Sequence, residues 1–146
     1  MKNIAVFASG NGSNLQAIVD VIKKGKLKAN LKLLVCDNPD AFVLRRAEKA
    51  KVKTLLVRRQ DYAAKKDFEE AIIKHLKAQA VDLIVLAGFM RILGPGIITE
   101  YRNRIINIHP ALLPSFKGAH AIKDAYDYGS KVTGVTVHFV DEETDH

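Results

Sequence analysis

Short apolar clusters alternate with longer amphipathic stretches along most of this chain of 146 residues. The clusters predict strands at 3–8, 31–36, 54–57, 83–87 and 105–108. The stretches between them predict helices at 15–22, 41–50 and 61–79. In the last of these helices Phe68, Ile72 and Leu76 fall on one face. Strands that alternate with helices are typical of parallel sheets, so the pattern predicts an α/β fold with a Rossmann-like, doubly wound, mostly parallel sheet.

The C-terminal part of the pattern is less regular. It predicts a short helix at 95–101, another at 119–128, and a strand at 132–140 whose alternation indicates half burial. No linker or repeat interrupts the chain, so we expect a single domain over residues 1–146. The acidic loop 141–146 directly follows the last predicted strand, and nothing after it could cover that strand. We therefore expect the domain to be truncated at its C-terminus or completed by a partner.

The composition supports a globular cytoplasmic protein. Hydrophobic residues make up 48% of the chain and charged residues 27%, which excludes a disordered or collagen-like chain. The apolar runs are far shorter than the roughly 20 residues of a membrane helix, and the N-terminus does not resemble a signal peptide. Cys36 is the only cysteine, so the chain can form neither an internal disulfide nor a cysteine-based zinc site.

The formal charge of +7 raises the question of a nucleic-acid partner. Residues 1–60 contain 13 Lys and Arg against 4 Asp and Glu, and the densest runs, 23–28 and 45–53, lie at predicted helix ends. Solvated helix ends are the simplest interpretation, and attraction of a phosphorylated small substrate is the next. No aromatic residues interleave these runs, so nucleic-acid binding is the least favoured interpretation.

Residues 9–15, with the sequence SGNGSNL, lie between the first predicted strand and the first helix. Glycines permit a tight turn there, and the N–H groups at the start of the helix suit a phosphate. Ser13 and Gln16 have the spacing of a capping box. Leu15 stands where a dinucleotide fingerprint needs glycine, so we predict a monophosphate site. The alternative is a capped helix start without a ligand.

A second motif, Asn107-Ile108-His109-Pro110, ends the fifth predicted strand at the carboxyl edge of the sheet. Strand alternation turns the amide of Asn107 and the imidazole of His109 to the same side. Together they could stabilise an oxyanion that develops during acyl transfer. The alternative is a purely structural histidine. Asp145 and His138 could reach this spot, and a carboxylate beside His109 would raise the pKa of its imidazole.

A third motif, LAGFMRIL at 86–93, follows the fourth predicted strand at the same edge. If its apolar side chains are exposed, they form a slot with Arg91 at the rim, suited to a flat heteroaromatic ligand. The alternative is that they belong to the core.

Four phrases of the chain, at 9–17, 86–93, 107–114 and 134–142, resemble the folate-dependent formyltransferases. The phrase at 107–114 is similar to the whole group, whereas that at 9–17 points to the phosphoribosylglycinamide formyltransferase (glycinamide ribonucleotide transformylase) branch. The resemblance implies the formyltransferase fold and transfer of a formyl group from 10-formyltetrahydrofolate to the amine of glycinamide ribonucleotide in purine synthesis. These two molecules are the expected partners. We expect no metal, nucleic acid or membrane, and leave a homodimer open.

The same resemblance implies roles for residues of the three motifs. The implied catalytic residues are Asn107, His109 and Asp145. The ribonucleotide phosphate is expected at Gly12, Ser13 and Asn14, and the folate at Met90, Arg91, Ile92, Leu93 and the shared Asn107. Where the family has an arginine for the folate, the alignment gives Lys65, with Lys66 as the neighbouring choice; lysine keeps the charge but not the two-pronged hydrogen bonding.

Family members continue for several tens of residues beyond the loop that holds the aspartate, with a further strand and a C-terminal helix. We therefore expect either an active formyltransferase or a catalytically silent fragment that still binds phosphate and folate. In the active enzyme, protonated His109 and Asn107 would stabilise the oxyanion, and Asp145 would keep the imidazole charged.

Overall fold

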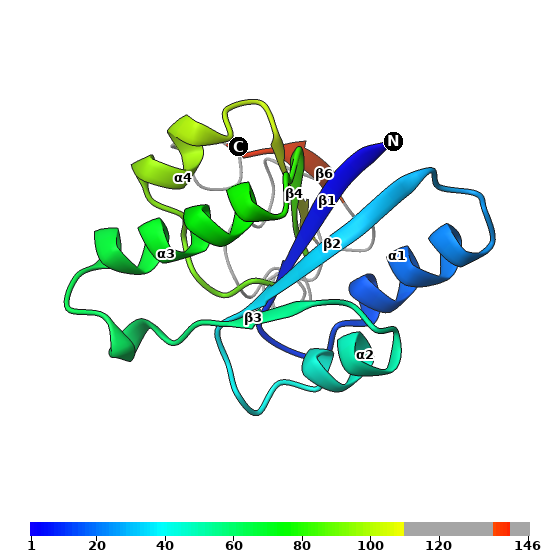
Figure 1. The fold of residues 1–146 in the computed structure, drawn as a ribbon, viewed down its shortest axis with the longest axis horizontal. Coiled ribbons are helices and arrows are strands. Elements are labelled where there is room, and N and C mark those ends of the chain that lie inside the picture. Colours follow the sequence, from blue (N-terminus) through cyan, green and yellow to red (C-terminus); the bar gives the residue numbers. More distant parts are fainter. Residues whose placement is uncertain (110–135, 141–146) are drawn as a thin grey trace, which may run out of the picture.

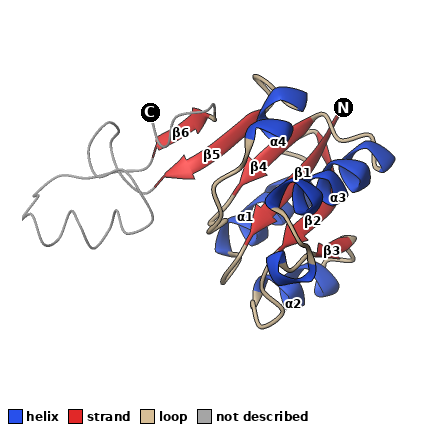
Figure 2. Cartoon of the chain, turned by 90° about the vertical axis from the view of Figure 1, so that its left-hand side faces the viewer, coloured by secondary structure: helices blue, strands red, loops and turns tan. Residues whose placement is uncertain are grey.

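The computed structural model describes residues 1–109 and 136–140, which form an α/β layer structure around a six-stranded sheet (Figures 1 and 2). The strand order is β3-β2-β1-β4-β5-β6. The first five strands are parallel, and β6 is antiparallel to β5. Their bounds are β1 Lys2–Ala8, β2 Ala29–Cys36, β3 Thr54–Leu56, β4 Leu83–Leu86, β5 Ile105–His109 and β6 Thr136–Phe139. This confirms the predicted doubly wound, mostly parallel sheet.

The helices lie close to their predicted positions. Their bounds are α1 Ser13–Lys23, α2 Val43–Lys49, α3 Lys65–Ala78 and α4 Pro95–Glu100, with a 3-10 turn at Arg59–Asp61. Helix α3 begins later than position 61 because the chain is extended at Tyr62, whose ring packs edge-on against Phe68 at 5.8 Å. The predicted helix 119–128 lies outside the described residues. No helix in the described part of the chain is long and apolar enough to cross a membrane.

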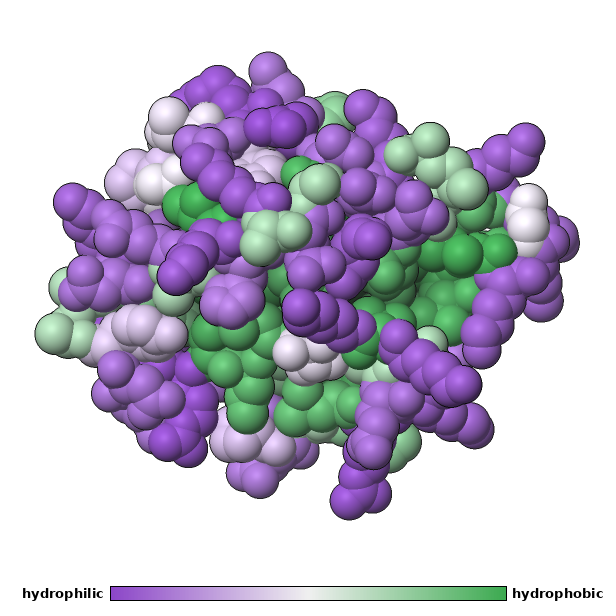
Figure 3. Space-filling view, in the orientation of Figure 1, coloured by the Kyte–Doolittle hydropathy of each residue, from purple (hydrophilic) through white to green (hydrophobic). Residues whose placement is uncertain are grey.

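Both faces of the sheet are buried, as expected for parallel strands. Helices α1 and α2 cover one face, and α3 and α4 cover the other (Figure 1). Alternate residues of β1 point to opposite faces of the sheet. Val6 belongs to the same core cluster as Leu15 of α1, whereas Phe7 belongs to that of Ile72 of α3. The face seen in Figure 3 is mostly hydrophilic at its rim, with hydrophobic residues between the helices.

The edge strand β6 shows the expected alternation, but Val137 and Phe139 are its exposed members, at 60% and 63%. They stand opposite Ile108 and Ile106 of β5. Figure 2 shows β6 beside β5 at the edge of the sheet, away from helices α1 and α2. His138 points to the other side, where it faces Asn107.

Candidate functional site

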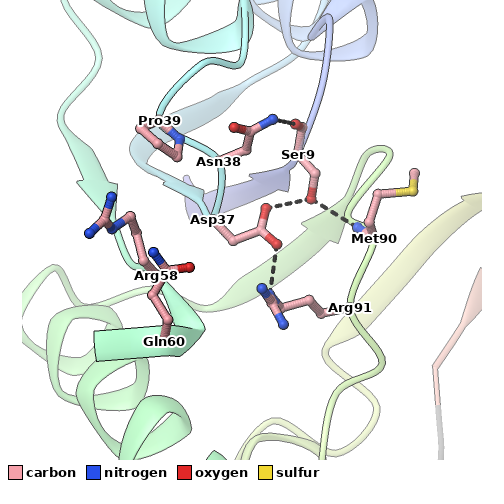
Figure 4. A pocket seen from close by; sticks show the side chains of 8 residues that line it. All are labelled: Ser9, Asp37, Asn38, Pro39, Arg58, Gln60, Met90 and Arg91. Carbon is pink, nitrogen blue, oxygen red and sulfur yellow. Dashed lines mark hydrogen bonds and ion pairs between the residues drawn. The ribbon is translucent and has the colours of Figure 1, made fainter. Parts of the chain in front are cut away.

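Three loops meet at the carboxyl edge of the sheet, where the strand order reverses between β1 and β4. Ligands of open α/β sheets bind at such a reversal. The backbone N–H of Ser9, after β1, donates to the carbonyl of Gly88, after β4, at 3.1 Å. A cavity of about 390 Å³ opens beside this contact (Figure 4). It is lined by Ser9, Asp37, Asn38, Pro39, Arg58, Gln60, Met90 and Arg91.

A buried carboxylate ties these loops together. The hydroxyl of Ser9 donates to Asp37 Oδ1 at 2.6 Å and accepts a bond from the backbone N–H of Met90 at 2.9 Å. Arg91 Nε donates to Asp37 Oδ2 at 2.8 Å. The Asp37 side chain is only 7% exposed, against 40% for Arg91. Asp37 was not predicted as a site residue. Its two partners lie 28 and 54 positions away in the chain, so the residues around Asp37 give no sign of these bonds.

The glycine turn, which we define as residues 9–14, starts α1 differently from the sequence prediction. The helix begins at Ser13, its N-cap is Gly12 with φ 81°, and no side-chain hydrogen bond caps it. The predicted capping box is therefore wrong: Gln16 instead donates to Asp20 Oδ1 through its side-chain amide at 3.0 Å. A side chain at position 12 would collide with Val43, whose Cγ2 lies 2.4 Å from the ideal Cβ position. The N-terminal turn of α1 thus keeps N–H groups available for an anion.

Arg46 of α2 fixes the outer side of this turn. Its Nε donates to the carbonyl of Asn11 and its Nη2 to Asn11 Oδ1, both at 2.8 Å. Its guanidinium also lies 4.9 Å from the centre of the Phe42 ring. A solvated helix end is the simplest interpretation of this basic run from the sequence, and no local pattern separates Arg46 from Arg45. Only the packing of α2 against the turn distinguishes them.

The loop 88–94 divides its apolar side chains between core and surface. Met90 and Ile92 are 64% and 69% exposed, whereas Leu93 is 8% exposed and belongs to the core. Phe89 packs edge-on against Phe7 at 5.3 Å. The motif therefore contains both exposed and core side chains, because successive side chains of the loop point in different directions. The ligand slot itself stays a prediction.

Glu69 fixes the far end of the loop. This glutamate of α3 is 5% exposed, and its Oε2 accepts the backbone N–H of Gly94 at 2.6 Å. A side chain at position 94 would come within 2.7 Å of Glu69 Oε1, so the Glu69 carboxylate would have to move to make room for it. Sequence reasoning missed Glu69, although a glutamate directly beside the apolar face of Phe68 and Ile72 could have drawn attention.

Asn107 lies on β5 with its Nδ2 3.3 Å from His138 Nε2. The Nδ1 of His138 lies 3.2 Å from the carbonyl oxygen of Phe139, which can only accept, so Nδ1 carries the proton of that bond. In the neutral imidazole, Nε2 then accepts a hydrogen bond from the Asn107 amide. The expected approach of His138 to Asn107 is thus present.

Comparison with known proteins agrees with this geometry. The family model "Formyl transferase" matches residues 2–146. This chain belongs to the formyl transferase family. Phosphoribosylglycinamide formyltransferase of Bacillus subtilis is 48% identical over 99% of this chain and 74% of its own length. The Escherichia coli protein of the same name is 41% identical over 98% of this chain and 68% of its own length.

Solved structures of formyl transferases share the fold. The crystal structure of glycinamide ribonucleotide transformylase 1 from Geobacillus kaustophilus has a TM-score of 0.97 and 50% identity, over 99% of this chain and 77% of that chain. The chain thus spans about three quarters of the Bacillus and Geobacillus relatives. The predicted formyltransferase fold is confirmed.

The remaining predicted site residues of this formyl transferase are only partly described. His109 ends β5, where it pairs with Thr136, and Asp145 lies outside the described residues. The catalytic trio therefore stays a prediction. Lys65 is the exposed first residue of α3 and does not line the cavity, whose basic residues are Arg58 and Arg91. Lys66 lies 3.9 Å from Glu70 in an exposed ion pair.

Neither a reactive cysteine nor a cluster of metal ligands is found near the site in the described part of this formyl transferase. Burial raises the pKa of the Cys36 thiol, which disfavours the reactive thiolate. Within residues 1–109 and 136–140, no group of three His, Cys, Asp or Glu side chains is placed to hold a metal ion.

Proposed function

We propose that this formyl transferase moves the formyl group of 10-formyltetrahydrofolate to the amine of glycinamide ribonucleotide, a step of purine biosynthesis. The observation that supports it most is the direct contact between the glycine turn, which leads into the uncapped start of α1, and the exposed apolar loop 88–94, through Ser9 N and Gly88 O at 3.1 Å. The start of α1 suits a phosphate, and the apolar loop suits a flat ring. The names of the relatives point to the same formyl transfer and to the same acceptor, glycinamide ribonucleotide.

The phosphate of the ribonucleotide would bind at Gly12, Ser13 and Asn14. The N–H groups of the first turn of α1 carry no bond from an N-cap side chain, and the helix dipole favours an anion there. Ser13 and Asn14 are exposed and can add side-chain hydrogen bonds. The basic excess of the N-terminal half would attract this phosphorylated substrate rather than a nucleic acid.

The pterin of the folate would bind against Met90, Arg91, Ile92 and Leu93. The exposed side chains of Met90 and Ile92 offer apolar surface on a loop that is hydrogen-bonded at both ends, and Leu93 anchors the same loop in the core. Lys65 is the residue we assign to the family's folate arginine. Both substrates are small and water-soluble, and we place the enzyme in the cytoplasm without a metal.

The transfer needs donors for the charge that develops on the formyl oxygen. The amine nitrogen bonds to the formyl carbon, the bond from that carbon to N10 of the folate breaks, and the proton lost by the amine ends on N10. Asn107 and a protonated His109 would donate hydrogen bonds to the formyl oxygen. Asp145 would hold the imidazole in its charged form, because an adjacent carboxylate raises a histidine pKa.

His109→Ala tests this assignment. We expect kcat to fall about 100- to 1,000-fold, with KM for either substrate within a few-fold, since the lost bond belongs to the transition state. The matched control is His75→Ala on α3, whose exposed ring hydrogen-bonds to the Ala71 carbonyl of its own helix. The rate of formyl transfer is measured through the release of tetrahydrofolate. Full activity of His109→Ala would exclude the assigned role, and absence of transfer by the unaltered chain would exclude the function.

A further inference from the structure

Asp37 is the most deeply buried charged group that lines the cavity, and the proposed chemistry does not use it. Its side chain is 7% exposed, and both of its oxygens accept hydrogen bonds from other loops. One bond comes from Ser9, after β1, and the other from Arg91, after β4. A buried carboxylate is costly unless it is paired in this way. The burial therefore indicates that these contacts hold the loops together.

The direction of each bond in this network is fixed by chemistry. The Met90 N–H can only donate and the ionised Asp37 carboxylate can only accept, so the Ser9 hydroxyl accepts from one and donates to the other. Figure 4 shows the resulting line from Met90 through Ser9 to Asp37, and on to Arg91. Charge on Asp37 strengthens each bond to it. The backbone of the loop is thereby held against the end of β1.

The guanidinium of Arg91 is engaged on two sides. Its Nε donates to Asp37 at 2.8 Å, and its Cζ lies 5.7 Å from the centre of the Phe68 ring of α3. This cation was expected at the rim of the ligand slot. It lines the cavity, but its guanidinium is paired with the buried Asp37, so the loop presents Met90 and Ile92 outward while Arg91 turns toward Asp37.

We propose that Asp37 is a positioning residue for the folate site: through Ser9 and Arg91 it holds the loop 88–94 in the conformation that receives the pterin. Arg91 contributes through this ion pair and not through contact of its guanidinium with the ligand. The inference rests on the proposed function for the identity of the ligand. The loop is then rigid before the ligand binds, which lowers the entropic cost of binding.

Asp37→Asn tests the role in binding. The amide has a single acceptor oxygen, so either Ser9 or Arg91 loses its acceptor, and we expect KM for 10-formyltetrahydrofolate to rise about tenfold. KM for glycinamide ribonucleotide and kcat are expected to stay within twofold. The matched control is Asp40→Asn, which removes the same charge from an exposed position on the same loop and leaves all three constants unchanged. Equal KM values for the folate in Asp37→Asn and the unaltered enzyme would overturn the proposal.

A double-mutant cycle separates positioning from direct contact. Arg91→Met keeps the length of the side chain and removes the ion pair. If Arg91 acts through Asp37, each single variant raises the folate KM about tenfold and the double variant raises it little further. Multiplication of the two effects, to about 100-fold, would show that Arg91 reaches the ligand independently and would refute its assignment.

Amide hydrogen exchange tests the network without any substrate. In the free protein we expect the Met90 amide to exchange about tenfold faster in Asp37→Asn and in Ser9→Ala than in the unaltered chain, because its acceptor is displaced or lost. Asp40→Asn should leave it unchanged. Unchanged exchange in both variants contradicts the network whether or not the enzyme transfers formyl groups. Faster exchange in a chain that transfers none would contradict the proposed function alone.

Discussion

The glycine turn and the loop 88–94 touch each other, yet different kinds of contact fix their conformations. The turn is held from its exposed side by Arg46 and by close packing of Gly12 on Val43. The loop is held from beneath by two buried carboxylates, Glu69 and Asp37, and Asp37 also bonds Ser9 at the start of the turn. The first therefore presents backbone N–H groups, whereas the second presents apolar side chains.

This difference shows how one sheet edge can serve two unlike ligands. A phosphate needs donors on a fixed backbone, and a left-handed glycine provides that backbone. A flat ring needs exposed apolar surface, which is stable only on a loop that cannot collapse into the core. In both cases the residues that fix the loop come from elsewhere in the chain. Arg46 bonds only the turn and Glu69 only the loop among the contacts described above, so substitution of either should affect one of them and spare the other.

The largest effect is expected from Gly12→Ala. The positive φ of 81° and the overlap with Val43, including its Cα at 2.9 Å, should lower the free energy of unfolding by about 2–5 kcal/mol. Gly25→Ala is the control, since φ is 72° there but nothing lies within 4 Å, and should cost only about 1 kcal/mol. Urea unfolding measures both. Equal losses would mean that Val43 yields and that packing does not fix the turn.

Glu69→Ala should loosen the far end of the loop. The buried N–H of Gly94 loses its acceptor, so we expect a loss of about 1–3 kcal/mol in the free energy of unfolding. Glu70→Ala, one residue on and exposed, should change it by less than about 0.5 kcal/mol. Urea unfolding of the pair makes the comparison. If both variants were equally stable, the buried carboxylate would not support the loop.

Arg46→Met should act on the glycine turn alone. Loss of its two bonds to Asn11 frees the turn, and we expect KM for glycinamide ribonucleotide to rise about five- to tenfold while the folate KM stays within twofold. Arg45→Met removes the same charge from the neighbouring exposed position and should change neither constant. A parallel rise in both KM values would show that the two loops are not held independently.

The smallest effect concerns the exposed ion pair between Lys77 of α3 and Glu100 of α4, at 2.7 Å. Its hydrogen bond and charge lower the pKa of Glu100 and raise that of Lys77. The stability that it adds is therefore full between the two ordinary pKa values. It is lost as pH falls through the lowered pKa of Glu100 or rises through the raised pKa of Lys77.

Glu100→Gln should accordingly lower Tm only slightly at pH 7, with no further change in 1 M salt, because exposed pairs are screened. The unaltered protein should lose that small difference as the salt is raised. A Tm loss as large as that of Glu69→Ala would remove the distinction between buried and exposed carboxylates that the comparison draws.

The fold could be read from the sequence because its signals are local. Phe68, Ile72 and Leu76 fall on one helical face and all three are buried, and the predicted strands end within a few residues of the observed ones. Burial depends on the period of the side chains along each element, which is written into neighbouring positions. The same local logic failed at Ser13, because a cap also depends on what packs beside it, here Val43 against Gly12.

Neighbouring residues alone thus specify the order of strands and helices, and they mark the glycine turn and the apolar loop as separate motifs. The contacts that hold these two segments arise only in the folded chain. Asp37 bonds Ser9 and Arg91, which are 28 and 54 positions away, and Glu69 bonds Gly94 across 25 positions. Such partners meet only after the strand order β2-β1-β4 brings their loops to one edge. That arrangement decides whether a charged residue faces water or fixes a loop. The residues next to it in the chain therefore do not reveal which of the two it does.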